Sequence, residues 1–342
     1  MPRVVTFGEI MLRLSPPGLE RFLQSPTLSA TFGGGEANVA VSLAGFGIDS
    51  VYVTALPAHA IGEAAVHALR AEGVRTDHIV RRGARVGIYF AETGASQRAS
   101  TVIYDRAHSS IAEMAPDALQ WNDIMTGAAW LHVSGITPAL GANAAESTRR
   151  AIGAARLAGA HVSFDLNFRR KLWSEAEAQR VVGPLLRDVD VVIANEEDLQ
   201  SVLGIHVPGT DVSASRLAHE GFRDAAERVT RDFGPRRVAI TLRESFSASD
   251  NGWSAMLWDA DAGRTFVSQR YEIRVVDRIG AGDSFAAGLI YALVSGRTAE
   301  DALRFAVAAS ALKHTIPGDF NRVSVAEVEQ LARGDASGRV QR

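Results

Sequence analysis

Short runs of β-branched residues alternate with helical stretches through most of the chain, and this rhythm restricts the fold more than any other feature. From residue 129 onward, strands are expected at 130–133, 161–164, 189–193 and 238–241. Helical patterns lie between them, near 142–157, near 175–186 and in a region that reaches 233. Strands separated by helices form parallel sheets. The sequence therefore predicts an α/β fold with at least four parallel strands.

Two segments interrupt this rhythm, at about residues 13–32 and 83–106. In the second, residues 87–90 and 100–104 have strand character with no helix between them, which is typical of a hairpin. We therefore expect a small antiparallel sheet that forms a lid. No linker or charge block divides the 342 residues. The chain is predicted to be one main domain, residues 1–333, followed by a flexible tail at 334–342 that lacks apolar periodicity.

Composition excludes several classes of protein. The 36 Lys and Arg against 39 Asp and Glu leave a net charge of −3, so no electrostatic footprint for nucleic acid or an anionic membrane is present. The longest weakly polar run, 37–48, is shorter than the roughly 20 residues of a membrane helix, and no signal-peptide pattern opens the chain, so we expect a cytoplasmic protein. The absence of cysteine rules out disulfides, thiolate zinc sites and a cysteine nucleophile.

The strongest chemical signal lies at residues 275–285, where a strand ends in the turn Gly280-Ala281-Gly282 and a helix of small residues follows. The first-turn N–H groups of a helix have no intrahelical acceptor, and with the helix dipole they bind anions such as phosphate. Asp283 places a carboxylate at the same helix start, where it can act as a base for a hydroxyl that attacks the phosphate. A simple helix cap is the alternative role for Asp283.

This turn, together with Gly33-Gly34-Gly35-Glu36-Ala37-Asn38-Val39-Ala40, resembles the two signatures of the ribokinase-like (pfkB) carbohydrate kinases, over about residues 4–325. The resemblance implies a doubly wound, mostly parallel sheet with helices on both faces and a small β-sheet lid over the sugar. It also implies ATP as phosphoryl donor, Mg²⁺, Asp283 as catalytic base, and an anion hole formed by the three turn residues. The chain departs from the common pattern at Arg278 and Ile279, where many members have small or hydroxyl residues.

Within that family, residues 8–14, 134–137, 164–169 and 241–245 are most similar to the 2-keto-3-deoxygluconate kinases. This similarity implies phosphorylation of the 6-hydroxyl of an acidic keto sugar. Arg13 stands where kinases of neutral sugars often have an aspartate, which disfavours a neutral substrate. The substrate shell implied by the resemblance is Gly34, Asn38, Tyr89, Tyr104, Arg106 and Arg169.

Arginine suits an acidic substrate because its planar fork pairs with a carboxylate through two hydrogen bonds. Tyr104 and Arg106 lie two residues apart on an expected strand and so face the same side. The alternative is that Arg106 is a solvated charge at the strand edge and that Tyr89 and Tyr104 only pack the lid.

The nucleotide side is expected to follow two other strands. Asn195-Glu196-Glu197-Asp198 resembles the family's Asn-x-x-Glu element, which helps to hold Mg²⁺ and phosphate, usually through water; the alternative is an Asn cap on a helix with an acidic first turn. Thr241 and Arg243 would face the phosphates, although residues 244–251 replace the small glycine-bearing loop of many members. Asp277 supports a monovalent cation such as K⁺ in some relatives. None of the nine histidines has metal-ligand spacing.

The sequence thus predicts an ATP- and Mg²⁺-dependent kinase of 2-keto-3-deoxygluconate that forms a homo-oligomer through its lid. Another sugar kinase of the family, such as a fructokinase, is one alternative, because lid residues alone select the sugar. A sugar- or nucleotide-binding sensor that has lost catalysis is another, although the intact Gly-Ala-Gly-Asp run disfavours it. The exact sugar, including gluconate or galactonate stereochemistry, stays open.

Overall fold

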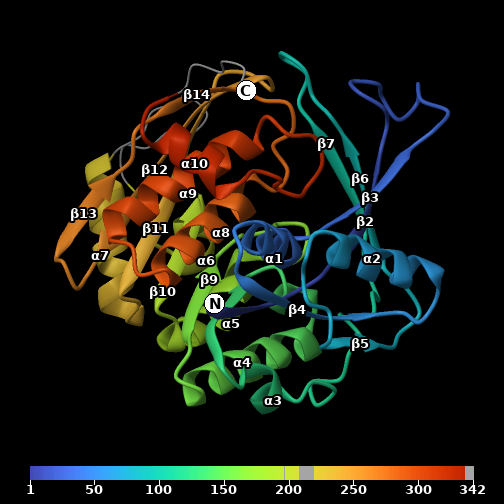
Figure 1. Cartoon of the computed structure of the whole chain (residues 1–342), viewed down its shortest axis with the longest axis horizontal. Helices are drawn as coiled ribbons and strands as arrows, with labels where there is room; N and C mark the ends of the chain where they lie inside the picture. Colours follow the sequence, from blue (N-terminus) through green and yellow to red (C-terminus); the bar gives the residue numbers. More distant parts are fainter. Residues whose placement is uncertain (196, 208–218, 336–342) are drawn as a thin grey trace.

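The computed structural model of the protein describes residues 1–195, 197–207 and 219–335. Within these residues the strands of the main sheet are β1 (Arg3–Phe7), β4 (Asp49–Leu56), β5 (Ile79–Arg81), β8 (Ala128–Ser134), β9 (His161–Asp165), β10 (Val191–Asn195), β11 (Arg237–Ser245), β12 (Asp250–Asp259), β13 (Arg264–Val267) and β14 (Tyr271–Arg274). Their order is β13-β12-β11-β10-β9-β8-β1-β4-β5, and β14 pairs with β12 (Figure 1). From β11 to β5 all pairs are parallel. The predicted α/β fold and its four parallel strands are confirmed.

The sheet is covered on both faces by helices. The helices are α1 (Gly35–Gly45), α2 (Ala60–Ala71), α3 (Trp121–Met125), α4 (Ala142–Leu157), α5 (Glu175–Leu185), α6 (Asp198–Leu203), α7 (His219–Phe233), α8 (Ala281–Val294), α9 (Ala299–Lys313) and α10 (Val325–Ala332). Neighbouring residues of β1 point to opposite faces: Val4 packs in a core with α1, α8, α9 and α10, and Val5 in a core with α3 to α7. Burial on both faces explains why these strands are almost continuously apolar.

Four further strands form a separate small sheet, which Figure 1 shows at one side of the main body. They are β2 (Met11–Ser15), β3 (Ser29–Gly33), β6 (Gly87–Glu92) and β7 (Thr101–Asp105), in the order β3-β2-β6-β7. The two outer pairs are antiparallel hairpins, as expected, but the central pair β2 and β6 is parallel. The expectation of a wholly antiparallel lid was therefore wrong. Between β2 and β6 the chain passes through β4 and β5 of the main sheet, and such a long crossover allows parallel pairing.

The largest differences from the expected strand boundaries are at β10 and β11. The N–H of Val189 closes a turn on the carbonyl of Leu186, so β10 begins only at Val191 and reaches Asn195. β11 continues to Ser245 and pairs with β12, so most of the expected loop at 244–251 is hairpin.

Two expectations concern regions beyond these elements. The tail expected at 334–342 is described only at Gly334 and Asp335, and residues 336–342 lie outside the described part. No helix in the described residues is long and apolar enough to cross a membrane.

Candidate active site

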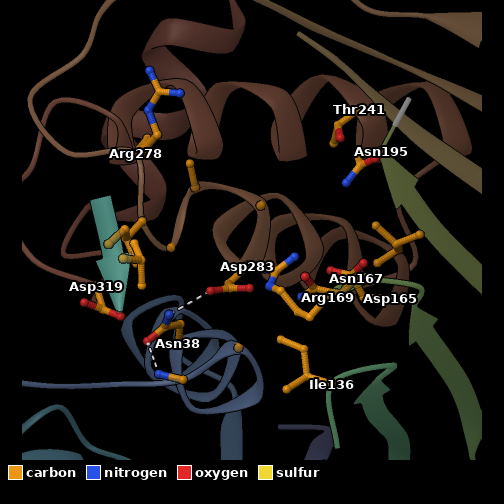
Figure 2. Close-up of a pocket in the computed structure, with 18 of the residues that line it drawn as sticks. Asn38, Ile136, Asp165, Asn167, Arg169, Asn195, Thr241, Arg278, Asp283 and Asp319 are labelled. Atoms are coloured by element: carbon orange, nitrogen blue, oxygen red, sulfur yellow. Dashed lines mark hydrogen bonds between the residues drawn. The ribbon is translucent and has the colours of Figure 1, made fainter. Parts of the chain in front are cut away.

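A cleft of about 380 Å³ lies where the carboxyl ends of the central strands meet the lid. The strand order reverses direction between β8 and β1, and α/β sheets bind ligands at such a point. Every residue that the sequence assigned to catalysis, substrate or nucleotide lines this cleft, as does Asp198. Figure 2 shows side chains from both signatures and from several strand ends pointing into it. Asp277 alone of the assigned residues does not line the cleft.

The turn before α8 is shaped by Gly280. Its φ of +85° is left-handed, and a Cβ there would lie 2.1 Å from the carbonyl oxygen of Asp319, so no side chain fits. Gly280 is the N-cap of α8, and Gly282 is exposed to the cleft. The N–H of Ala281 donates to the carbonyl of Arg278 at 3.3 Å. The remaining first-turn amides can therefore meet an anion at the floor of the cleft.

Asp283 is the third residue of α8 and does not cap it, because Gly280 holds the N-cap position and no side chain caps this helix. The capping alternative is wrong. The Nδ2 of Asn38 donates to the Asp283 Oδ2 at 2.7 Å (Figure 2). Burial raises the pKa of Asp283 to about 6, although the hydrogen bond from Asn38 and the charge of Arg169 oppose that rise. The carboxylate is thus ionised at neutral pH, and its pKa is suited to accepting a proton.

The start of α1 is anchored beneath Asp283. The buried Glu36 accepts hydrogen bonds from the N–H and hydroxyl of Ser134, at 3.1 and 2.7 Å, and from the hydroxyl of Thr137 at 2.8 Å. Burial raises the pKa of Glu36. The N–H of Gly34 donates to the Oδ1 of Asn38 at 3.3 Å, which turns the Nδ2 of Asn38 toward Asp283. The Gly-Gly-Gly-Glu-Ala-Asn signature therefore orients Asn38.

On the lid, Tyr89 of β6 lies opposite Tyr104 of β7, with ring centroids 6.1 Å apart. The Arg106 guanidinium lies 5.4 Å from the centre of the Tyr104 ring. Arg106 is buried and its Nε donates to the Glu9 carboxylate at 2.8 Å, so the alternative of a solvated strand-edge charge is wrong. Sequence reasoning missed Glu9, although it lies within the 8–14 segment. Its carboxylate neutralises Arg106 before any substrate binds.

Arg13 has no contact with this cleft. It is buried elsewhere, where its Nη2 and Nη1 meet Asp277 at 2.8 Å and Asp319 at 2.9 Å. At the position where kinases of neutral sugars often have an aspartate, this chain therefore has an arginine that pairs with two carboxylates of the protein itself. Tyr89 donates its hydroxyl proton to the same Asp319, with oxygens 2.6 and 2.7 Å away.

The segment after β9 supplies Asp165, Asn167 and Arg169, which Figure 2 shows next to Asp283. Of these three residues, the sequence analysis predicted a role only for Arg169. Asp165 and Asn167 lie in the same 164–169 segment, but no role was predicted for them. Burial, with repulsion from Asp198 and Asp283, raises the pKa of Asp165 well above its ordinary value. Arg169 donates from Nη1 to the Phe168 carbonyl at 3.0 Å, and its positive charge opposes the rise in the pKa of Asp165, Asp198 and Asp283.

At the end of β10, Glu197 holds the N-cap position of α6, so the capping alternative for Asn195 is wrong. Its Oδ1 accepts the N–H groups of Glu197 and Asp198 at 2.8 and 3.0 Å. Asp198 is buried, which raises its pKa, and its two oxygens accept the N–H groups of Asn195 and Phe168 at 3.1 Å each. The Nδ2 of Asn195 still faces the cleft (Figure 2). Glu196 lies outside the described residues.

Thr241 and Arg243, both on β11, line the same end of the cleft as expected. Arg278, which the sequence marked only as a departure from the family pattern, lines it as well. Burial and the charge of Arg243 lower the pKa of Arg278 below its ordinary value, and an approaching phosphate would offset this repulsion. Further lining residues are Asn251, Trp253, His314 and Asp319.

The carboxylates fit a Mg²⁺ ion that is held mainly by phosphate oxygens and water. No group of three or more His, Cys, Asp or Glu side chains in the described chain could hold a metal alone. Asp165, Asp198 and Asp283 nevertheless lie close together, and burial, with the charges of Asp198 and Asp283, raises the pKa of Asp165. Mg²⁺ keeps several waters and needs only one or two carboxylates, so this charge suits it.

Several known proteins are similar to this chain over nearly its whole length. A 2-dehydro-3-deoxygalactonokinase of Haloferax volcanii is 35% identical over 335 residues and covers 98% of each chain. A 2-dehydro-3-deoxygluconokinase of Bacillus subtilis is 27% identical over 94% of this chain and 93% of its own. The crystal structure of the 2-dehydro-3-deoxygluconokinase of Thermotoga maritima superposes with a TM-score of 0.94 at 50% identity, covering 98% of this chain and all of that one. Residues 1–322 match the family described as pfkB family carbohydrate kinase. With both signatures converging on Asp283, the chain belongs to the pfkB family of carbohydrate kinases.

Proposed function

We propose that the protein transfers the γ-phosphoryl group of ATP to the 6-hydroxyl of 2-keto-3-deoxygluconate in the presence of Mg²⁺. The observation that carries the proposal is Asp283, held by Asn38 at 2.7 Å between the phosphate-binding turn and the tyrosines and arginines of the sugar side. The similarity to the 2-dehydro-3-deoxygluconokinases of Thermotoga and Bacillus supports the sugar, and the pfkB match supports phosphoryl transfer to a carbohydrate.

Asp283 acts as the general base. Ionised at neutral pH, it accepts the proton of the substrate hydroxyl as that oxygen attacks phosphorus. Asn38 keeps the carboxylate in place and occupies its Oδ2, which leaves Oδ1 for the substrate. Proton transfer needs an approach to about 3 Å, so this orientation matters more than the strength of the base.

The turn and two arginines stabilise the transferring group. The amides at the start of α8 point at the position where negative charge gathers, and they need no rearrangement during the reaction. Arg243 and Arg278 line the same end of the cleft and add positive charge. Mg²⁺ supplies further neutralisation of the phosphate oxygens when it is bound, with Asp165, Asp198 and Asn195 as the nearby oxygen and amide groups.

Arg169 is the residue best placed to recognise an acidic sugar. Arg106 is already neutralised by Glu9, whereas Arg169 forms no direct ion pair with a described carboxylate and acts on Asp165, Asp198 and Asp283 only through its charge. A substrate carboxylate would complete its charge and gain a paired, charge-assisted hydrogen bond. Arg106 and Tyr104, stacked on each other, then form a polar wall of fixed shape around the sugar hydroxyls.

The galactonate stereoisomer of the substrate is the second candidate. It is favoured by the Haloferax relative, whose printed name is 2-dehydro-3-deoxygalactonokinase. The two sugars carry the same carboxylate, keto group and 6-hydroxyl, so Asp283 and Arg169 serve both. Only contacts to the remaining hydroxyls could distinguish them.

A coupled ADP-release assay tests the proposal. The purified protein is offered ATP, Mg²⁺ and, in parallel, 2-keto-3-deoxygluconate, 2-keto-3-deoxygalactonate, fructose and ribose. We expect the highest kcat/KM with one or both keto-deoxy acids. A kcat/KM for fructose or ribose equal to or above those values would reject the substrate class, and no ADP release with any sugar would support a binding sensor.

We also propose that the protein is cytoplasmic and that copies of the chain associate through their lids. Leu19, Leu23 and Leu28, in the connection between β2 and β3, are exposed apolar side chains. Burying them against a second copy would remove apolar surface from water. Sedimentation velocity measures the oligomeric state directly, and a monomer at micromolar concentration would contradict the association.

A further inference from the structure

Arg13 occupies a closed polar site directly behind the phosphate-binding turn. The side chain is only 5% exposed although it comes from the lid strand β2. Each of its nitrogens has a partner: Nη2 lies 2.8 Å from Asp277, Nη1 lies 2.9 Å from Asp319, and Nε donates to the Ser15 hydroxyl at 2.9 Å. Burial lowers its pKa, but attraction to the two carboxylates outweighs this and raises it. The guanidinium is therefore a permanent cation at this site.

The two carboxylates hold the backbone on either side of the turn. Asp277 accepts the N–H of Ile279 at 3.0 Å with Oδ1 and the N–H of Gly318 at 3.0 Å with Oδ2. The neighbouring carbonyl of Asp319 packs directly against Gly280. A cation that fixes Asp277 and Asp319 therefore also fixes the turn whose amides face the phosphate.

The charges at this site are already balanced without a metal ion. Asp277 and Asp319 are opposed by Arg13 and by the buried Lys313, whose ammonium group donates to the Ile316 carbonyl at 3.1 Å and is attracted by both carboxylates. Burial nevertheless lowers the pKa of Lys313 and raises that of Asp319. A further buried cation would have to compete with Arg13 and Lys313 for these two carboxylates, and both oxygens of Asp277 already receive N–H donors. The expected monovalent cation at Asp277 does not fit.

We infer that Arg13 is a built-in cation that replaces a monovalent metal ion behind the phosphate-binding turn, so that phosphoryl transfer does not require K⁺. Arg13 is a positioning residue: it touches no substrate and acts through Asp277 and Asp319 on the turn at Gly280. Because Arg13 belongs to lid strand β2, its ion pairs with Asp277 and Asp319 connect the lid to the turn at Gly280. This inference rests on the proposed phosphoryl transfer.

The first experiment uses the unmodified protein. Its kcat and its Tm are measured with Mg²⁺ present and with tetramethylammonium, sodium or potassium chloride at equal ionic strength. We expect kcat to agree within about two-fold and Tm to be equal in all three salts, because Arg13 already supplies the positive charge behind the turn. Activation of about ten-fold or more by K⁺, or a Tm raised by K⁺ alone, would overturn the inference.

The second experiment removes the cation. Arg13→Ala leaves two buried carboxylates without it, and should lower Tm on the order of 5–10 °C and kcat at least about ten-fold. K⁺ should now raise the Tm of this variant relative to tetramethylammonium, by binding the folded state. Arg13→Lys, which keeps the charge without the planar fork, should recover part of both losses.

Arg85→Ala is the matched control, since it removes a half-exposed ion pair with Asp105 at the lid and should change neither Tm nor cation response appreciably. An Arg13→Ala variant with the activity and Tm of this control would overturn the inference. The Tm measurements need no turnover, so they decide the role of Arg13 even if none of the sugars is phosphorylated.

Discussion

Replacing Asp283 with asparagine should lower kcat on the order of 10²–10⁴-fold, because the variant keeps the shape of the site but cannot accept a proton. This range corresponds to about 2.7–5.4 kcal/mol of transition-state stabilisation, at about 1.36 kcal/mol for each factor of ten. The fold should survive. The new amide oxygen can still accept the hydrogen bond that Asn38 now donates at 2.7 Å, and a neutral group is easier to bury than a carboxylate.

The assay follows ADP release against pH for both proteins. An acid whose folded pKa is raised stays protonated to higher pH, so the wild-type kcat/KM should fall as pH drops below about 6, rather than near the ordinary value of 3.8. The asparagine variant should lack this acidic limb. Asp301→Asn is the matched control, because Asp301 is also the third residue of its helix, α9, but is exposed to solvent. Its kcat should stay at the wild-type value.

A near-normal kcat for Asp283→Asn would refute the assignment, and so would an acidic limb that persists unchanged in that variant. A loss of activity accompanied by a large loss of Tm would show instead that the carboxylate stabilises the start of α8. Circular dichroism and thermal unfolding of both variants separate these outcomes.

Two further predictions concern the sugar side and the turn. Arg169→Ala should raise KM for the sugar acid at least about ten-fold but hardly change KM for its uncharged alcohol analogue, since it removes a carboxylate partner. Arg106→Ala leaves the buried carboxylate of Glu9 unpaired, so it should lower Tm and raise KM equally for the sugar acid and its alcohol analogue. If steady-state kinetics showed the same behaviour for both variants, the separate roles of Arg169 and Arg106 would be contradicted. Gly280→Ala should cost about 1–3 kcal/mol of stability and most of kcat, because its Cβ would press on the Asp319 carbonyl at 2.1 Å. Gly296→Ala, also left-handed at φ +77° but with open space around it, should lose about 1 kcal/mol or less and keep full activity; equal losses in thermal unfolding would show that the contact is unimportant.

The parts of the molecule that could be predicted from the sequence are those that depend on local chain geometry. Strands that helices cover on both faces are almost continuously apolar and are separated by helices in the sequence. This pattern correctly predicted four parallel strands. The phosphate-binding turn is equally local, since three consecutive residues and a following helix form it. The resemblance to known kinases placed both Asn38 and Asp283 in one site. The two residues are 245 positions apart in the sequence, so no periodicity could indicate their contact.

What only the tertiary structure decided are the partners of buried charges. Arg106 pairs with Glu9 across 97 positions, and Arg13 with Asp319 across 306. In sequence each of these arginines could equally be a surface charge or a ligand for substrate. Burial makes the difference, because a guanidinium removed from water must find a carboxylate, and the chain positions that meet are set by how the lid folds back on the main sheet. The same long-range folding made the central lid strands parallel and placed Arg13 against Asp277 and Asp319.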